Sequence, residues 1–192
     1  GDALGVVQRT GCVAPGGGGT TTAYIAHHTG GALIPVQSQL GAGCVLTAVA
    51  INGSMLCTTE PKSPSATTWR FLNNSVGVIR NINVSLLGAL CTGHGSLHDF
   101  EGVTLSADSQ YMTIDAGCLQ GNTRFDQLFI VAIATGTAQP VATGTYLASD
   151  SWLPDDTLLC NDLSNPSGAV ASLVSLEGVV AESAAGELAA LK

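Results

Sequence analysis

Residues 45–58, with the sequence VLTAVAINGSMLCT, decide the fold class of this chain. Asn-Gly between two apolar runs is the strongest short-range signal of a β-hairpin, because both residues tolerate the positive φ of a two-residue turn. With a turn at Asn52-Gly53, Ala48 faces Cys57 and Cys44 lies near the far end of the hairpin. The stretch therefore predicts two paired antiparallel strands, without implying a bond between Cys44 and Cys57.

The strand pattern continues towards the C-terminus. Residues 75–87 alternate apolar with polar side chains, which is typical of a strand with one wet face. Residues 128–134, LFIVAIA, are apolar on both faces and predict a central strand. Residues 103–105 and 112–116 predict a second hairpin that turns near Asp108-Ser109.

Many short strand candidates separated by Gly, Pro and Asn, with no long helices between them, predict an all-β fold. We expect an antiparallel β-sandwich of the jelly-roll-like kind. Residues 149–167 carry several acids and two prolines and are expected to form a loop. Residues 182–192 combine Ala, Leu and Glu with a closing Lys, so a short C-terminal helix is expected there.

The N-terminal residues predict an arm. A short apolar run is followed by four consecutive glycines, Gly16–Gly19, which make a flexible joint. We therefore expect residues 1–19 to form an arm with a Gly-rich hinge, and residues 20–192 to form a single β-sandwich domain. The apolar residues 3–7 are expected either to fold back as an edge strand or to pair with the sheet of a neighbouring subunit. The charge-poor segment 20–40 is the rival candidate for such an exchange.

Charge is scarce and unevenly placed. Residues 10–59 contain no Asp, Glu, Lys or Arg, and 10% of the whole chain is charged, against about 25% in a typical soluble domain. The net charge of −8 disfavours nucleic acids and anionic membranes as partners, because both would repel the chain. No stretch is apolar for long enough to predict a membrane span. A surface so poor in charge predicts cover by copies of the same chain, by sugar, or by both.

The cysteines are dispersed along the chain, with neither a CxxC motif nor the Cys and His spacing of a zinc site. An even, dispersed set predicts up to three disulfides in an oxidising compartment, so an extracellular or cell-surface location is expected. Buried reduced cysteines in a cytosolic protein are the alternative, and the sequence does not choose among the possible pairings. The candidates are Cys12, Cys44, Cys57, Cys91, Cys118 and Cys160.

The densest group of chemically active side chains lies in residues 91–99, CTGHGSLHD. Cys91, His94 and His98 are candidate metal ligands. Asp99 is a candidate either for a further ligand or for a hydrogen-bond partner that orients one of the ligands. Hydrolytic catalysis through His98, Asp99 and a serine is a weaker alternative, because the orienting carboxylate must reach the far nitrogen of the imidazole ring. The favoured interpretation is a polar loop between strands, with Cys91 in a disulfide.

Two further groups contain candidate metal ligands. His27 and His28 are neighbours on a strand-like segment and would point to opposite faces, so they do not easily share one metal. The acids between Asp150 and Asp162 offer oxygen ligands for Ca²⁺, but not at the spacing of a calcium-binding loop. The sequence therefore predicts no catalytic residue, no metal site and no cofactor.

Three Asn-X-Ser sequons make Asn52, Asn73 and Asn83 candidates for N-glycosylation. Asn52 lies in the predicted turn, Asn73 precedes a predicted strand and Asn83 lies on the polar face of that strand. A glycan at these positions would screen a charge-poor surface.

The leading hypothesis is an extracellular structural subunit that assembles with copies of itself into a filament, sheath or shell. Exchange of the N-terminal strand between subunits is the expected route. A secreted carbohydrate-binding or adhesive β-sandwich module is the alternative, although few aromatic residues such as Trp69 and Trp152 are available to stack on sugars. A viral capsid or spike subunit is a variant of the leading hypothesis. An enzyme is not expected.

Overall fold

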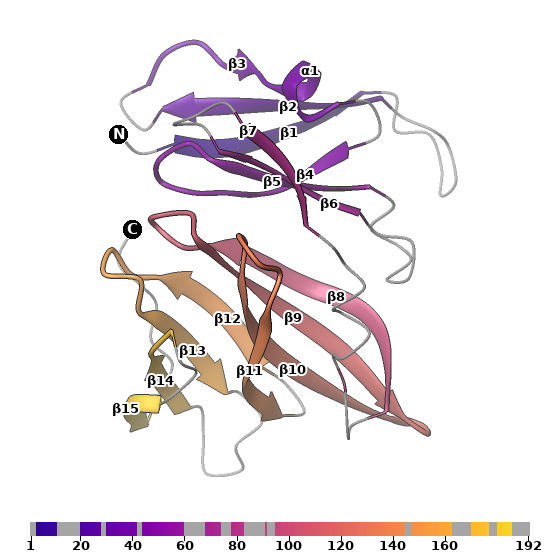
Figure 1. The fold of residues 1–192 in the computed structure, drawn as a ribbon, viewed down its shortest axis with the longest axis vertical. Coiled ribbons are helices and arrows are strands. Elements are labelled where there is room, and N and C mark those ends of the chain that lie inside the picture. The colour runs from indigo at the N-terminus through magenta and orange to yellow at the C-terminus, as the bar shows by residue number, and fades with distance from the viewer. Residues whose placement is uncertain are drawn as a thin grey trace.

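The computed structural model describes strands that group into antiparallel sheets (Figure 1). The described residues are 3–10, 20–27, 30–41, 44–59, 68–73, 78–82, 91, 95–144, 147–162, 170–176 and 180–185. Within them the sheets number four, with strand orders β1-β2-β3, β4-β5-β6-β7, β11-β10-β9-β8 and β12-β13-β14-β15. Strands that follow one another in the sequence therefore lie next to one another in the same sheet.

The first two sheets take up the N-terminal part of the chain. The strands of the first sheet are β1 (Ala3–Thr10), β2 (Thr20–His27) and β3 (Ile34–Pro35). A one-turn helix, α1 (Gln37–Leu40), follows β3. The strands of the second sheet are β4 (Cys44–Val49), β5 (Met55–Thr59), β6 (Thr68–Asn73) and β7 (Val78–Ile82).

The last two sheets follow the same plan. The strands of the third sheet are β8 (Ser96–Leu105), β9 (Tyr111–Gln120), β10 (Thr123–Ala132) and β11 (Ala138–Gly144). The strands of the fourth sheet are β12 (Leu147–Trp152), β13 (Leu158–Asp162), β14 (Val170–Val174) and β15 (Val180–Ala185).

The first strands of successive sheets contact one another, β1 with β4, β4 with β8 and β8 with β12. The sheets therefore radiate from a common line of inner strands, and Figure 1 shows the first two sheets above the last two. The expectation of an all-β antiparallel fold is confirmed. The sheets are sequential meanders, however, and not the two facing sheets of a sandwich or the Greek keys of a jelly roll. Short strands and tight turns are common to all these architectures, so the sequence pattern does not tell them apart.

Each junction between neighbouring sheets has its own apolar core. Leu128 and Ile130 of β10 pack towards the fourth sheet, while Phe129 and Val131 pack towards the second. Because successive side chains of a strand point to opposite faces, a sheet with a neighbour on each side must be apolar on both. This confirms the predicted central strand over residues 128–132, where it explains the lack of alternation, whereas Ile133 and Ala134 lie in the turn that follows β10.

The first hairpin forms, but with a different turn. Val49 faces Met55, and the Ala50 N–H donates to the Ser54 carbonyl oxygen over 2.8 Å, so three residues, Ile51 to Gly53, make the loop. The Gly53 N–H donates to the Ala50 carbonyl oxygen over 2.8 Å, and of the loop residues only Gly53 has a positive φ, at 82°. The side-chain oxygen of Asn52 accepts the Ser54 N–H, a local bond that favours this longer turn.

The longer turn changes which residues face each other. A register shift between Leu46 and Ala48 puts Leu46 opposite Cys57, so the expected pairing of Ala48 with Cys57 is wrong. Cys44 lies two residues along β4 from Leu46 and reaches Cys57 diagonally, and the two form a disulfide. The second hairpin is confirmed, because β8 and β9 pair on either side of Asp108-Ser109.

Two expectations about the C-terminal third are wrong. Residues 182–185 belong to β15, in which Glu182 faces Leu173 of β14, so pairing in a sheet overrides helix propensity there. Residues 186–192 lie outside the described residues. The expected loop at 149–167 contains β13, whose residues Leu158 to Cys160 are buried because they fill the core between the third and fourth sheets.

The N-terminal residues fold back onto their own chain. β1 pairs antiparallel with β2 from Ala3–His27 to Thr10–Thr20, as one of the two expectations for the arm required. The expected hinge, Gly16–Gly19, lies outside the described residues. Gln37 of α1 ties this sheet to the next one: its Oε1 accepts the Ala23 N–H, and its Nε2 donates to the carbonyl oxygens of Gly41 and Cys44.

Candidate functional site at the inner strands

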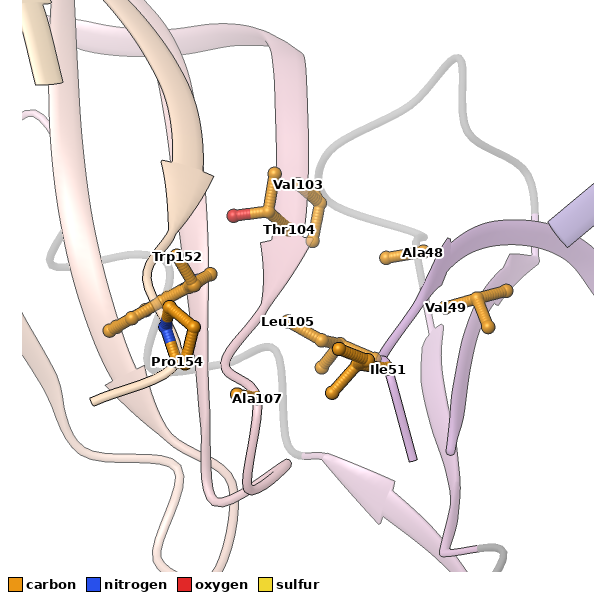
Figure 2. A pocket seen from close by; sticks show the side chains of 9 residues that line it. All are labelled: Ala48, Val49, Ile51, Val103, Thr104, Leu105, Ala107, Trp152 and Pro154. Atoms are coloured by element: carbon orange, nitrogen blue, oxygen red, sulfur yellow. The ribbon is translucent and has the colours of Figure 1, made fainter. Parts of the chain in front are cut away.

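A hollow of about 310 Å³ lies where the inner strands of three sheets meet (Figure 2). β4 and its turn, β8 and the turn after it, and the end of β12 each supply part of the wall. The lining residues are Ala48, Val49, Ile51, Val103, Thr104, Leu105, Ala107, Trp152 and Pro154. Residues separated by about half of the chain thus form one site, because the sheets share a line of first strands.

The wall of the hollow is apolar. It contains no ionisable side chain, and the hydroxyl of Thr104 already shares a hydrogen bond of 2.5 Å with that of Thr113. The indole N–H of Trp152 is buried and has no hydrogen-bond partner among the described residues. Ile51 stands at the turn with 48% of its surface exposed. The hollow can bury an apolar group by hydrophobic contact, but it offers no acid, base or nucleophile.

A charged network crosses the third sheet. Arg124 contacts the carboxylates of Asp99 and Asp126, each at 3.2 Å. Asp99, Gly117 and Asp126 face one another across β8, β9 and β10, so the guanidinium passes over the backbone of Gly117. A Cβ atom at Gly117 would collide with Asp99 and Arg124. Because Asp126 is almost fully buried, its ion pair is structural.

The residues of the 91–99 group are not brought together as a metal or catalytic site. Cys91 forms a disulfide with Cys118, with their Cα atoms 5.6 Å apart, so its sulfur is not a thiolate ligand. Asp99 pairs with Arg124, and His98 is exposed on β8. His94 lies outside the described residues. Among the residues that are described, no group of His, Cys, Asp or Glu side chains is arranged to hold a metal ion.

The acids between Asp150 and Asp162 are spread over β12, a turn and β13. The Asp155 carboxylate accepts the Thr157 N–H over 3.1 Å, and this bond, together with one from the Thr157 hydroxyl, lowers the pKa of Asp155. Asp156 accepts the N–H of Asp108 over 3.4 Å and so links two turns. His27 lies in β2, and His28 lies outside the described residues.

The remaining candidates are cysteines and sequons. Cys160 is buried in the core between the third and fourth sheets, whereas Cys12 lies outside the described residues. The half-buried Asn52 accepts hydrogen bonds from the Ser54 N–H and the Ser109 hydroxyl, both of 2.9 Å. Asn73 ends β6 and is also half-buried. Asn83 lies outside the described residues.

Sequence reasoning did not find the hollow. Its residues are ordinary strand aliphatics in three separate segments, and only the arrangement of the sheets brings them together. Trp152, a large apolar residue between acids, is the one signal that the sequence offered.

Neither the protein-family models nor the curated proteins compared with this sequence match it. Solved structures with a similar fold are β-propellers. TolB from Acinetobacter baumannii gives a TM-score of 0.50 at 13% sequence identity, over 83% of this chain and 37% of that one. The β-propeller domain of the Trilobed protease from Pyrococcus furiosus, described as having an open velcro topology, gives a TM-score of 0.47 at 12% identity, over 74% of this chain and 43% of that one.

The chain spans less than half the length of each of these structures. The similarity to TolB concerns the fold alone. In this chain one three-stranded and three four-stranded meanders follow one another around a line of inner strands, and the described sheets do not close into a ring. Among the described residues, no helix has the length and apolar character needed to cross a membrane.

Proposed function

We propose that this chain is a non-catalytic extracellular subunit that associates with copies of itself through the outward face of its first sheet. On β2, Ala23 and Ile25 are buried against the second sheet, whereas Thr22, Tyr24 and Ala26 alternate with them and remain partly exposed. Leu33 and Ile34 border this face at the edge strand β3, with 49% and 45% of their surfaces exposed. Ile34 faces Ile25 across the pair of β2 and β3 and therefore lies on the same side of the sheet as Ile25. Figure 1 shows this sheet at the top end of the array.

The observation that carries the proposal is the chemistry of this face. Residues 20–41 contain no charged side chain, and two large aliphatic residues, Leu33 and Ile34, are exposed at the β3 edge of this sheet. Soluble monomers rarely leave an uncharged apolar patch open to water, and such patches usually mark contact surfaces.

The other end of the array makes a symmetric contact the better choice. The strands of the fourth sheet contain Asp150, Asp162 and Glu182, and burying these acids against an uncharged face would cost their solvation. First sheet against first sheet brings like surfaces together in a two-fold pair. In a filament, sheath or shell, exchange of β1 between neighbouring pairs supplies the second contact.

Disulfides support the extracellular part of the proposal. Cys44–Cys57 and Cys91–Cys118 are the kind of bond that persists in oxidising compartments. The roles of a sugar-binding module and of a capsid or spike subunit stay predictions from the sequence.

Sedimentation velocity over a range of concentrations tests the proposal. The wild-type chain is expected to associate as its concentration rises, and the Leu33→Asp/Ile34→Asp variant to stay monomeric. Ile51→Asp is the matched control, because Ile51 is as exposed as Leu33 but belongs to the hollow. A wild-type chain that remains monomeric near millimolar concentration, or a control variant that is equally impaired, would refute self-association through this face.

A further inference from the structure

A second pocket, of about 240 Å³, lies between the second and third sheets and shares no residue with the hollow. β6 and β7 supply one side, and the turns before β9 and after β10 supply the other. The lining residues are Phe71, Asn73, Arg80, Ser109, Gln110, Ile133 and Ala134. We call it the Arg80 pocket.

Arg80 is the only charged residue in this lining. It is exposed, and its Nη1 donates to the carbonyl oxygen of Ala134 over 3.1 Å, which holds the guanidinium at the pocket. Because a guanidinium has five N–H donors, one such bond leaves most of them available. In a chain with a net charge of −8, a cation whose pocket contains no carboxylate is a strong local attraction for an anion.

The nearest acid in the turn does not compete for this cation. Asp108 accepts hydrogen bonds from the Ser106 hydroxyl over 2.7 Å and from the Gln110 N–H over 2.9 Å. These two bonds hold its carboxylate within its own turn. Arg80 is therefore not neutralised by an acid among the residues that line the pocket.

The rest of the pocket is amphipathic and fixed in place. Phe71 and Ile133 are buried and give it an apolar floor, while the carboxamides of Asn73 and Gln110 lie in its wall. The Ile133 N–H donates to the Gln110 carbonyl oxygen over 2.9 Å, which ties the two turns together. The Ser109 hydroxyl donates to Asn52 over 2.9 Å and anchors the same turn to the second sheet.

We propose that the Arg80 pocket binds a small organic carboxylate. The guanidinium pairs with the carboxylate through charge-assisted hydrogen bonds, the carboxamides donate to its remaining lone pairs, and the apolar part of the ligand covers Phe71 and Ile133. The pocket is slightly smaller than the usual range of ligand sites, which begins at about 300 Å³, so the ligand is compact. A free carboxylic acid and the C-terminus of a peptide share this chemistry.

NMR titration of the ¹⁵N-labelled chain tests the proposal. The probes are 3-phenylpropionate and its uncharged amide, and then N-acetyl-Ala-Phe with a free or an amidated C-terminus. Both carboxylates, or one of them, are expected to shift the signals of Gln110, Ala134 and the Asn73 side-chain amide, whereas the amides are not. Binding of the free acid alone identifies a small-molecule site, and tighter binding of the peptide acid identifies a C-terminus as the ligand.

Two variants separate the charge from the fold. Arg80→Gln is expected to weaken carboxylate binding by at least about tenfold, because a charge-assisted bond is lost. Arg80→Lys keeps the charge without the planar fork and is expected to bind with intermediate affinity. The spectrum of each unliganded variant reports whether the fold is intact. The proposal is overturned if neither carboxylate binds, if acid and amide bind alike, or if a folded Arg80→Gln variant binds as wild type does.

Discussion

The Cys91–Cys118 disulfide makes the sharpest prediction about stability. It joins two fully buried residues separated by 27 positions and fixes the chain before β8 to the C-terminal part of β9. In the chain-entropy description, closing a loop of this length destabilises the unfolded state by about 3.5 kcal/mol at 25 °C, and a loop of the Cys44–Cys57 size by about 3 kcal/mol. Either loss is a large fraction of the roughly 5–15 kcal/mol that holds a domain folded.

The perturbation is Cys91→Ala/Cys118→Ala, which avoids placing hydroxyl groups in an apolar core. Guanidinium chloride unfolding, followed by the fluorescence of the buried Trp69, is expected to show a free energy of unfolding lower by about 3.5 kcal/mol or more. With a slope of about 4 kcal/mol per molar for a chain of this size, the midpoint falls by about 1 M. The matched variant is Cys44→Ala/Cys57→Ala, which opens the shorter loop.

Two results would refute this reasoning. A loss below about 1 kcal/mol for the Cys91–Cys118 pair would mean that the bond hardly constrains the unfolded chain. A Cys44–Cys57 variant that is less stable than the Cys91–Cys118 variant by more than about 1 kcal/mol would mean that loop length does not set the order.

Three further predictions concern single positions. Gly95 and Gly121 both have positive φ, but only at Gly95 would a Cβ atom collide with the backbone of Leu119. Urea unfolding should show that the free energy of unfolding falls by about 1–2 kcal/mol in Gly121→Ala and by clearly more in Gly95→Ala. Equal losses would contradict the geometry. Arg124→Ala should lower the free energy of unfolding by about 3 kcal/mol, because it leaves the buried Asp126 without its ion-pair partner. Asp99→Ala, at the more exposed end of the network, should lower it by less than about 1 kcal/mol. The reverse order would be evidence against a structural role for the ion pair with Asp126. In an NMR pH titration the pKa of Asp155 should lie below its ordinary value and should rise in Thr157→Val, which keeps the N–H donor but loses the hydroxyl. Because the folded pKa is the lower one, this bond stabilises the fold above the unfolded pKa, and its contribution disappears as the pH falls through the folded pKa. An unchanged pKa in the variant would exclude the hydroxyl as a cause.

Local patterns in the sequence predicted the strands that depend on local interactions. The hairpin at Asp108-Ser109 follows from turn chemistry, and the central strand over residues 128–132 follows from side chains that are apolar on both faces. The pattern failed where distant partners decide the outcome. Glu182 lies in a segment of high helix propensity, but pairing with β14 places it in a strand. The turn at Asn52 shifted the register because one side-chain bond to Ser54 stabilises a longer loop.

The packing of the sheets against one another could not be predicted from the sequence either, because it also depends on distant partners. Nothing local to β4, β8 or β12 indicates that the three lie together, so the hollow around Trp152 was not predictable. The Arg80 pocket also needs two sheets, because β6 and β7 supply one side and the turns next to β9 and β10 supply the other. Such sites come from the packing of sheets, which a single sequence does not report.

The radial arrangement also accounts for the scarcity of charge. A sheet between two others has both faces covered, and the part of β10 that fills both cores, residues 127–132, carries no charge, whereas Arg124 and Asp126 lie at the other end of the strand. Among the described residues, the first sheet has a neighbouring sheet on one face only, yet residues 20–41 are as free of charge as residues 127–132 of β10. The composition of the first sheet is therefore that of a sheet covered on both faces. In the proposed function the second cover is another copy of the same sheet, which would bury Leu33 and Ile34 without burying a charge.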